Sequence, residues 1–333
     1  MRTTQLLSTV DLHVAGLPVR VVTAGVAALP GATMEQRRQH FIAHRDDLRT
    51  MLVCEPRGTS WMSGAILQPS TRPDADWGVL FIEVTGVLPM CGAGTIAVAT
   101  ALVDTGMVTV TEPVTTIRLD VPIGLIEVDV QVRAGKAEAA TIRNVPSYVQ
   151  ELDRPIDMPG TGTVRCDIAF GGNFYAFVDP DEVGIDLDTA DARSLTAIGT
   201  RIMQAVTDQV ALDHPESGPT DCEHVMFIDP RSTSRHVRQA LINHPGWLDR
   251  SPGGTGTSAY MAVLHERGAL APDTDLSSES FIGTTFTGRI VETTRVGDHA
   301  AIVPSITGSA WITALSQVVM DPADPFPAGF TVS

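Results

Sequence analysis

Lysine, cysteine and long apolar runs are all scarce in this 333-residue sequence. Lys136 is the only lysine and the formal net charge is −16, so no basic block is present to bind nucleic acid or an anionic membrane surface. No apolar stretch approaches the length of a membrane span, and residues 1–4 do not begin a signal peptide. These absences exclude nucleic acid and membranes as expected partners and leave a small molecule open.

The four cysteines (Cys54, Cys91, Cys166 and Cys222) are far apart, and none forms a CxxC pair. Disulfide scaffolds and structural zinc sites need closely placed cysteines, so we expect neither of them and no metal. The simplest location for such a chain is the reducing cytoplasm. Hydrophobic residues make up 43% of the sequence and charged residues 19%, which is typical of a globular protein with room for two domains.

Two glycine-rich stretches indicate that the sequence contains a duplication. When residues 90–99 (MCGAGTIAVA) are aligned with the stretch that ends in SPGGTGTSA, Gly92 matches Gly254 and Gly94 matches Gly256. A second, weaker match relates residues 11–22 to residues 167–178. Two matches in the same order favour the duplication of a whole domain.

Each glycine-rich turn is followed by an apolar segment that predicts a helix. Residues 95–103 carry no charged side chain, and a helix that is apolar on every side is a buried one. We therefore expect an α+β fold of two similar lobes, each a curved, mostly antiparallel sheet around a central buried helix. Residues 1–125 and 312–333 should form the N-terminal lobe and residues 126–311 the C-terminal lobe, with the active site in the cleft between them.

Cys91 lies just ahead of the first predicted helix, where backbone N–H groups and the helix dipole favour negative charge. A thiol in this position is expected to have a lowered pKa. Gly92 and Gly94 let the backbone approach an anion, and residues 253–256 offer a second such turn. A lone cysteine is more often an inert small hydrophobe, but the presence of two equivalent anion-binding turns favours a catalytic thiol.

These two turns resemble the signature motifs of the proline racemase family, through residues 90–95 (MCGAGT) and 249–258 (DRSPGGTGTS). Shorter matches extend the resemblance over nearly the whole chain: residues 55–58, 167–176, 282–289 and 308–312. The family includes proline racemases, 4-hydroxyproline 2-epimerases and trans-3-hydroxy-L-proline dehydratases. The resemblance implies diaminopimelate-epimerase-like lobes, no cofactor, an imino acid substrate of the proline or hydroxyproline type, and a homodimer.

In the racemases and epimerases of this family, each motif supplies a cysteine. One thiolate removes the α-proton, and the other thiol protonates the opposite face. The resemblance implies that Cys91 is the catalytic thiol here and that Asp249 pairs with the ring nitrogen. It also implies that four backbone N–H groups bind the substrate carboxylate, namely those of Gly92, Ala93, Gly254 and Thr255.

The sequence departs from the family pattern at two positions. Position 253 is glycine where racemases have cysteine and dehydratases have threonine, and Ala93 replaces the usual histidine. We expect both changes to enlarge the pocket. Gly253 has no proton to give, so a two-thiol inversion is disfavoured, while one base can still remove a proton and expel a neighbouring hydroxide.

The sequence therefore predicts a hydro-lyase that dehydrates trans-3-hydroxy-L-proline to Δ1-pyrroline-2-carboxylate. Cys91 would take the α-proton, and Thr255 or a water in the space beside position 253 would assist the leaving hydroxyl. One alternative is a proline or hydroxyproline 2-epimerase whose second acid is not a cysteine at position 253. Cys222 and His224 are candidates for that acid, although residues 221–224 are better interpreted as an exposed turn. Another alternative is an inactive paralogue that only binds an imino acid.

Overall fold

The computed structural model describes residues 3–215 and 218–331. The chain divides into two compact units. Unit 1 consists of Met1–Ile142 with Gly308–Ser333, and unit 2 consists of Arg143–Thr307. Among the described residues, no helix has the length and apolar character needed to cross a membrane.

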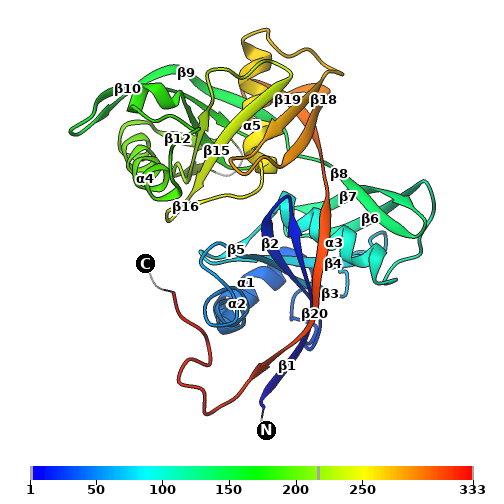
Figure 1. Cartoon of the computed structure of the whole chain (residues 1–333). Helices are drawn as coiled ribbons and strands as arrows, with labels where there is room; N and C mark the ends of the chain where they lie inside the picture. Colours follow the sequence, from blue (N-terminus) through cyan, green and yellow to red (C-terminus); the bar gives the residue numbers. More distant parts are fainter. Residues whose placement is uncertain (1–2, 216–217, 332–333) are drawn as a thin grey trace. The chain divides into compact units, whose positions relative to one another are not determined.

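Unit 1 is a mostly antiparallel sheet with three helices (Figure 1). Its strands follow the order β20-β1-β2-β3-β4-β6-β7-β8, in which β2/β3 and β4/β6 are the parallel pairs. The short strand β5 also pairs with β4. The elements of this unit are β1 (Gln5–Val14), β2 (Leu17–Ala24), α1 (Met34–His44), α2 (Asp46–Val53), β3 (Ser63–Gln68), β4 (Trp77–Glu83), β5 (Val87–Leu88), α3 (Gly92–Asp104), β6 (Val114–Val121), β7 (Gly124–Arg133), β8 (Lys136–Arg143) and β20 (Ala310–Met320).

Unit 2 has the same strand pattern and closes on itself, because β19 pairs with β9. Its strands follow the order β9-β10-β11-β14-β15-β17-β18-β19, with β11/β14 and β15/β17 parallel. The elements are β9 (Ser147–Met158), β10 (Gly162–Phe170), β11 (Phe174–Val178), the 3₁₀ turn η1 (Pro180–Val183), α4 (Ala192–Gln209), β12 (Leu212–His214), β13 (Gly218–Thr220), β14 (His224–Ile228), β15 (His236–Asn243), β16 (Trp247–Leu248), α5 (Gly254–Glu266), β17 (Asp275–Glu279), β18 (Thr285–Val296) and β19 (His299–Gly308).

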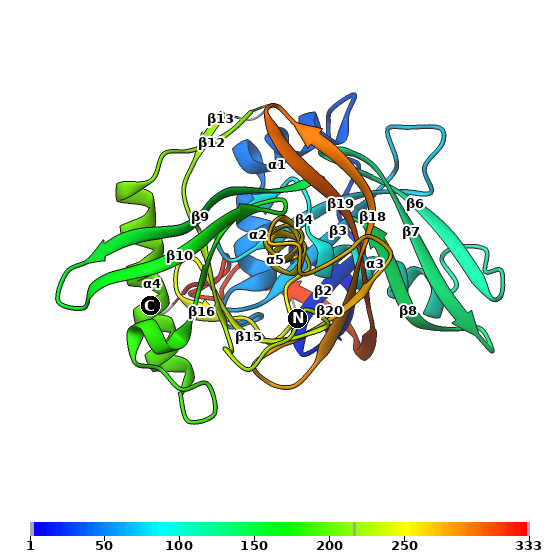
Figure 2. The same cartoon turned by 90° about the horizontal axis from the view of Figure 1, so that it is seen from above.

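The duplication inferred from the sequence is confirmed by this topology. In both units, the parallel and antiparallel pairs follow in the same order, and the equivalent helices α3 and α5 precede the strand that makes the second parallel pair. Figure 2 views α5 along its axis, encircled by strands of unit 2. Residues 92–103 of α3 are all buried, as expected for an apolar helix inside its sheet.

The glycines that the two turns share allow each helix to pack closely against its sheet. A Cβ added to Gly94 would lie 2.7 Å from Cδ1 of Phe81 on β4. A Cβ added to Gly256 would lie 2.6 Å from Cε of Met226 on β14. A larger residue at either position would force the helix or these neighbouring side chains to shift, so these glycines serve the fold as well as the turn.

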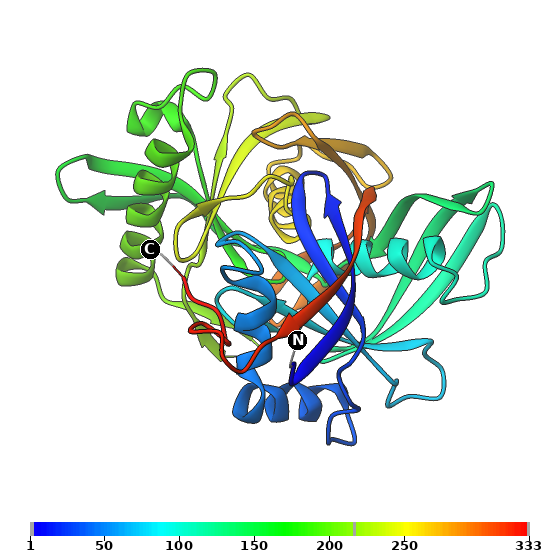
Figure 3. The same ribbon diagram turned by 60° about the horizontal axis from the view of Figure 1, so that its bottom comes forward.

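The observed boundaries between the units differ from those expected from the sequence. Residues 126–142 belong to unit 1 because β7 pairs with β6 and β8 continues the same sheet. The chain also returns to unit 1 at Gly308, earlier than expected. Residues 324–330 run beside the end of α2 (Figure 3), where the N–H of Phe330 donates to the carbonyl of Glu55 at 2.7 Å.

Candidate active site

Cys91 is the N-cap residue of α3, in an extended conformation with φ −147°. Its Sγ accepts a hydrogen bond from the backbone N–H of Gly94 at 3.3 Å. The first intrahelical bond of α3 runs from the N–H of Thr95 to the carbonyl of Cys91 at 2.9 Å. The N–H groups of Gly92 and Ala93 therefore have no acceptor within the helix. The sulfur lies at a helix end whose N–H groups and dipole both favour an anion.

The other three cysteines lie in apolar surroundings. Burial raises the pKa of the Cys166 and Cys222 thiols to about 12 and also raises the pKa of Cys54. Cys91 is only partly buried. Because the thiolate is the reactive form of cysteine, Cys91 is the one cysteine in an environment that suits proton abstraction.

The start of α5 repeats the geometry of α3 without a side chain at the cap. Gly253 is the N-cap residue, with φ 71° and ψ 107°. The first intrahelical bond of α5 runs from the N–H of Thr257 to the carbonyl of Gly253 at 2.9 Å. The N–H groups of Gly254 and Thr255 are thus placed like those of Gly92 and Ala93 in α3. Both turns carry the backbone donors that an anion needs.

The space beside Gly253 is occupied by Leu241. A Cβ added to Gly253 would lie 2.5 Å from Cδ2 of Leu241, a buried residue of β15. The positive φ would also strain any other L-residue at this position. The expectation that glycine leaves an open space here is therefore wrong, because a neighbouring core side chain fills the place of the missing Cβ.

Asp249, which follows β16, is a buried carboxyl group held by neutral donors. It accepts hydrogen bonds from the N–H of Ser251 at 2.8 Å, from Oγ of Ser251 at 3.0 Å and from Nδ2 of Asn243 at 3.2 Å. Burial raises the pKa of Asp249 above its ordinary value, against the effect of these hydrogen bonds. A buried carboxylate whose hydrogen-bond donors are all neutral is well suited to pair with a cationic ligand.

A row of side chains across three strands extends from Asp249. Strand register places Tyr175 of β11 opposite His224 of β14, and His224 opposite Asn243 of β15. Nδ1 of His224 is 2.8 Å from Oδ1 of Asn243. The rings of His224 and Tyr175 stack with their centroids 4.6 Å apart. The hydroxyl of Tyr175 is 2.6 Å from Oγ1 of Thr255, so the row ends at the first turn of α5.

This row fixes the protonation state of His224. Asn243 donates its amide N–H to Asp249, so its oxygen faces His224 and accepts the proton on Nδ1. Burial lowers the pKa of His224 from 6.5 to about 4. At neutral pH the ring is therefore neutral, with its proton on Nδ1 and an acceptor at Nε2.

The interpretation of residues 221–224 as an exposed turn is wrong for two of its members. Cys222 is 3% exposed and packs in the core of unit 2, and His224 begins β14 as part of the polar row. Neither side chain is suited to supply the second proton. The thiol of Cys222 is buried, and the single proton of the neutral His224 ring is donated to Asn243.

The lowered pKa of His224 predicts a loss of stability in acid. The unfolded chain, with a histidine pKa near 6.5, binds a proton more readily than the folded protein, so stability is complete above about pH 6.5 and falls as the pH drops towards 4. The full effect is about 3 kcal/mol. Urea unfolding at pH 7.0, 5.5 and 4.5 should show a smaller loss for His224→Gln than for the wild type. Equal losses in the two proteins would contradict the assignment.

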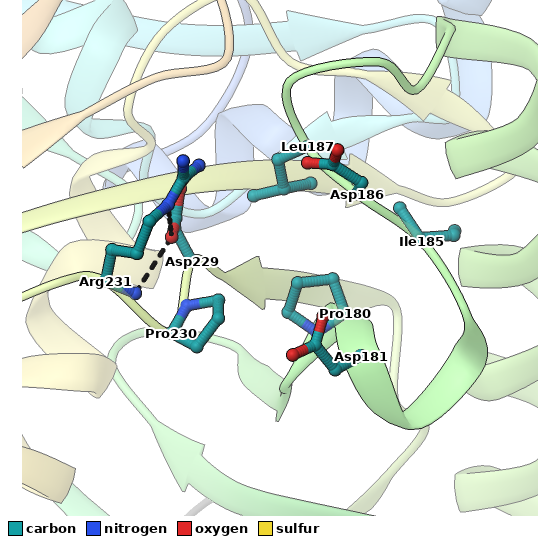
Figure 4. A pocket seen from close by; sticks show the side chains of 8 residues that line it. All are labelled: Pro180, Asp181, Ile185, Asp186, Leu187, Asp229, Pro230 and Arg231. Atoms are coloured by element: carbon teal, nitrogen blue, oxygen red, sulfur yellow. Dashed lines mark hydrogen bonds and ion pairs between the residues drawn. The ribbon is translucent and has the colours of Figure 1, made fainter.

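A separate hollow in unit 2 has a different character. It encloses about 210 Å³ near η1 and the end of β14 (Figure 4), at the opposite end of these strands from Tyr175 and His224. The Asp229 carboxylate pairs there with Arg231 at 2.7 Å and with Arg238 at 3.0 Å, and these partners hold the pKa of Asp229 well below its usual range. The charge of Asp229 is therefore already neutralised by protein partners. Over residues 3–215 and 218–331, no group of three or more His, Cys, Asp or Glu side chains is placed to hold a metal ion.

Several residues of the site were not identified from the sequence. Tyr175 lies inside the stretch 167–176 that carries part of the family resemblance, so a signal for it existed. Asn243 and Leu241 lie on a strand with no motif, and only their register beside His224 and the start of α5 reveals them. Gly254 and Thr255 lie at the start of α5, where the sequence predicted the second helix to begin.

Comparison with known proteins identifies the family of this chain. The family model described as proline racemase matches residues 9–331. The chain is 56% identical over 331 residues to a 4-hydroxyproline 2-epimerase of Streptosporangium roseum, covering 99% of both chains, and 37% identical to a proline racemase of Acetoanaerobium sticklandii, covering 100% of both. It superimposes with a TM-score of 0.89 and 33% identity on a hydroxyproline epimerase from Agrobacterium vitis with bound trans-4-hydroxy-L-proline, covering 100% of this chain and 97% of that one. The chain therefore belongs to the proline racemase family.

Proposed function

We propose that this chain is an isomerase that inverts the α-carbon of an imino acid of the 4-hydroxyproline type. The observation that carries the proposal is the position of Cys91, a partly exposed thiol at the start of a buried helix, with its sulfur bonded to the N–H of Gly94. This arrangement stabilises a thiolate, the base that removal of an α-proton requires.

Backbone N–H groups and one side-chain carboxylate are proposed to bind the substrate. The N–H groups of Gly92, Ala93, Gly254 and Thr255 suit a carboxylate, because each pair lies at the start of a buried helix. Asp249 suits the positively charged ring nitrogen, because its present hydrogen-bond donors are neutral. A substrate held at its carboxylate and its nitrogen presents the intervening α-carbon in a fixed orientation.

Epimerisation is preferred over dehydration because the relatives of this chain carry epimerase and racemase names. Dehydration of trans-3-hydroxy-L-proline stays the second candidate, and one observation favours it. Gly253 has no side chain that could donate a proton to the opposite face, and elimination requires only one base. The homodimer and the cytoplasmic location remain predictions from the sequence.

An assay in D₂O separates the candidates. The protein is incubated with trans-4-hydroxy-L-proline, L-proline or trans-3-hydroxy-L-proline, and the products are resolved by NMR and chiral chromatography. We expect inverted 4-hydroxyproline with deuterium at Cα and slower inversion of proline. Δ1-pyrroline-2-carboxylate from the 3-hydroxy substrate, without inversion of either other substrate, would contradict the proposal in favour of the lyase. Thermal stabilisation by all three without turnover would indicate a binding protein.

A further inference from the structure

The start of α5 lacks the side-chain cap that the start of α3 has. Cys91 caps α3 by accepting the N–H of Gly94, whereas Gly253 makes no side-chain hydrogen bond at the cap of α5. Glycine also has the widest choice of backbone angles of any residue. Groups outside the turn must therefore fix the direction of the N–H groups that follow Gly253.

Gln239 of β15 holds the residue just before this glycine. Its Nε2 donates to the carbonyl of Pro252 at 2.7 Å. Residues two apart on a strand share a face, and Leu241, two residues further along β15, occupies the place of a Cβ at Gly253. Gln239 thus holds the carbonyl side of the peptide between Pro252 and Gly253, while Leu241 packs against the glycine itself.

The other half of the Gln239 amide has no partner. The residue is 1% exposed, and its Oε1 accepts no hydrogen bond from the described residues. The carbonyl of Pro252 can only accept, so the amide nitrogen must face it. A buried acceptor without a partner lowers stability, and an apolar side chain of the same length would avoid that loss. The amide at this position is therefore better explained by its one donor than by a contribution to the fold.

Two longer bonds hold the same peptide. Oγ1 of Thr257 is 3.4 Å from the carbonyl of Pro252. On the other side of the peptide, the N–H of Gly253 donates to Oγ of Ser251 at 3.3 Å. The bond from Gln239 is the shortest of the three, and short hydrogen bonds constrain direction most. The orientation of this peptide therefore depends chiefly on Gln239.

We propose, on the basis of the proposed function, that Gln239 is a positioning residue for the carboxylate site. By holding the Pro252 carbonyl, it directs the N–H groups of Gly254 and Thr255 towards the ligand. Without this bond the glycine cap gains freedom to turn, and the two donors lose their common direction. The ring nitrogen is bound by Asp249 in the proposed site, so loss of the bond weakens the hold on the carboxylate and spares the hold on the nitrogen.

The test measures the binding of two partial ligands by ligand-observed NMR and does not depend on turnover. Cyclopentanecarboxylate carries the carboxylate without the nitrogen, and pyrrolidine carries the nitrogen without the carboxylate. In Gln239→Met we expect the Kd of cyclopentanecarboxylate to rise about tenfold, as for the loss of one hydrogen bond to a charged group. The Kd of pyrrolidine should stay unchanged. The urea midpoint should not fall, because the change also removes the unpartnered oxygen.

Gln68→Met is the matched control in unit 1. Gln68 of β3 is also 1% exposed, but both halves of its amide are engaged. Its Oε1 accepts the N–H of Leu29 at 2.8 Å, and its Nε2 donates to the carbonyl of Leu67 at 3.1 Å. Its replacement should lower the urea midpoint and leave both Kd values unchanged. The two glutamines should therefore show opposite patterns in stability and in binding.

The other outcomes separate this inference from the proposed function. A Gln239→Met protein that binds both ligands like the wild type overturns the positioning role and leaves the epimerase intact. Equal weakening of both ligands shows that Gln239 only supports the fold. A wild-type protein that binds neither ligand and inverts no imino acid overturns the proposed function itself. Should Gln239→Met fail to fold, unchanged carboxylate binding in Thr257→Val, which removes the longer bond to the same carbonyl, would overturn the role of that carbonyl.

Discussion

Replacing Cys91 by serine is expected to slow removal of the α-proton by about 10²–10⁴-fold, the usual contribution of a positioned general base. A serine hydroxyl at this site is a far weaker base than the thiolate proposed at the start of α3. The fold should not suffer, because serine is among the preferred N-cap residues and can accept the N–H of Gly94 in place of sulfur. The measurement is the rate of deuterium incorporation at Cα, together with the free energy of unfolding in urea.

Cys166→Ala is the matched control for this change. Cys166 is 3% exposed in the core of unit 2, so its replacement should lower the unfolding free energy by about 1 kcal/mol through lost packing and leave the exchange rate unchanged. The two variants should therefore show opposite effects on rate and stability. Iodoacetamide should also label Cys91 before the other three cysteines, whose pKa values are raised by burial. Retention of more than a tenth of the exchange rate in Cys91→Ser would contradict the assigned base.

Replacing Asp249 by asparagine should lower kcat/KM by about 10²–10³-fold. The change removes one partner of the proposed buried charge pair with the substrate nitrogen, and such a loss typically amounts to about 2–5 kcal/mol. The variant should bind a carboxylic acid that lacks the ring nitrogen as weakly as the wild type does, since the role proposed for Asp249 involves the nitrogen and not the carboxylate. Kinetics with the imino acid and competition by the nitrogen-free analogue measure both effects. Equal losses for both ligands would show that Asp249 only supports the fold.

The pH dependence gives Asp249 a second signature. Because burial raises its pKa, the carboxylate proposed to bind the ring nitrogen is lost at a higher pH than that of an exposed aspartate, and the acid limb of kcat/KM should lie at correspondingly higher pH. The contribution of Asp249 to stability depends on pH in the opposite direction. A carboxyl group with a raised folded pKa contributes stability at low pH that disappears as the pH rises through that pKa. Ser251→Ala keeps the charge but removes the hydroxyl donor, so it should move the acid limb to still higher pH.

The sequence determined those features that depend on neighbours along the chain. The thiol at position 91, the glycines after it and the uncharged stretch that follows together predict a capped, buried helix, because caps and periodicity are local properties. The repeat of that pattern at Gly254 and Gly256 predicted two equivalent units. The sequence also shows directly that residue 253 is glycine, and hence that a second thiol is lacking at this position.

Only the tertiary structure decided what surrounds that glycine. Leu241 reaches Gly253, and Tyr175, His224 and Asn243 form one row, because strands distant in sequence pair in a particular register. A shift of a single residue in any strand would turn these side chains to the other face of the sheet. Register is set by the packing of the whole core rather than by any local pattern, and for that reason the polar row between Asp249 and Thr255 could not be predicted from the sequence.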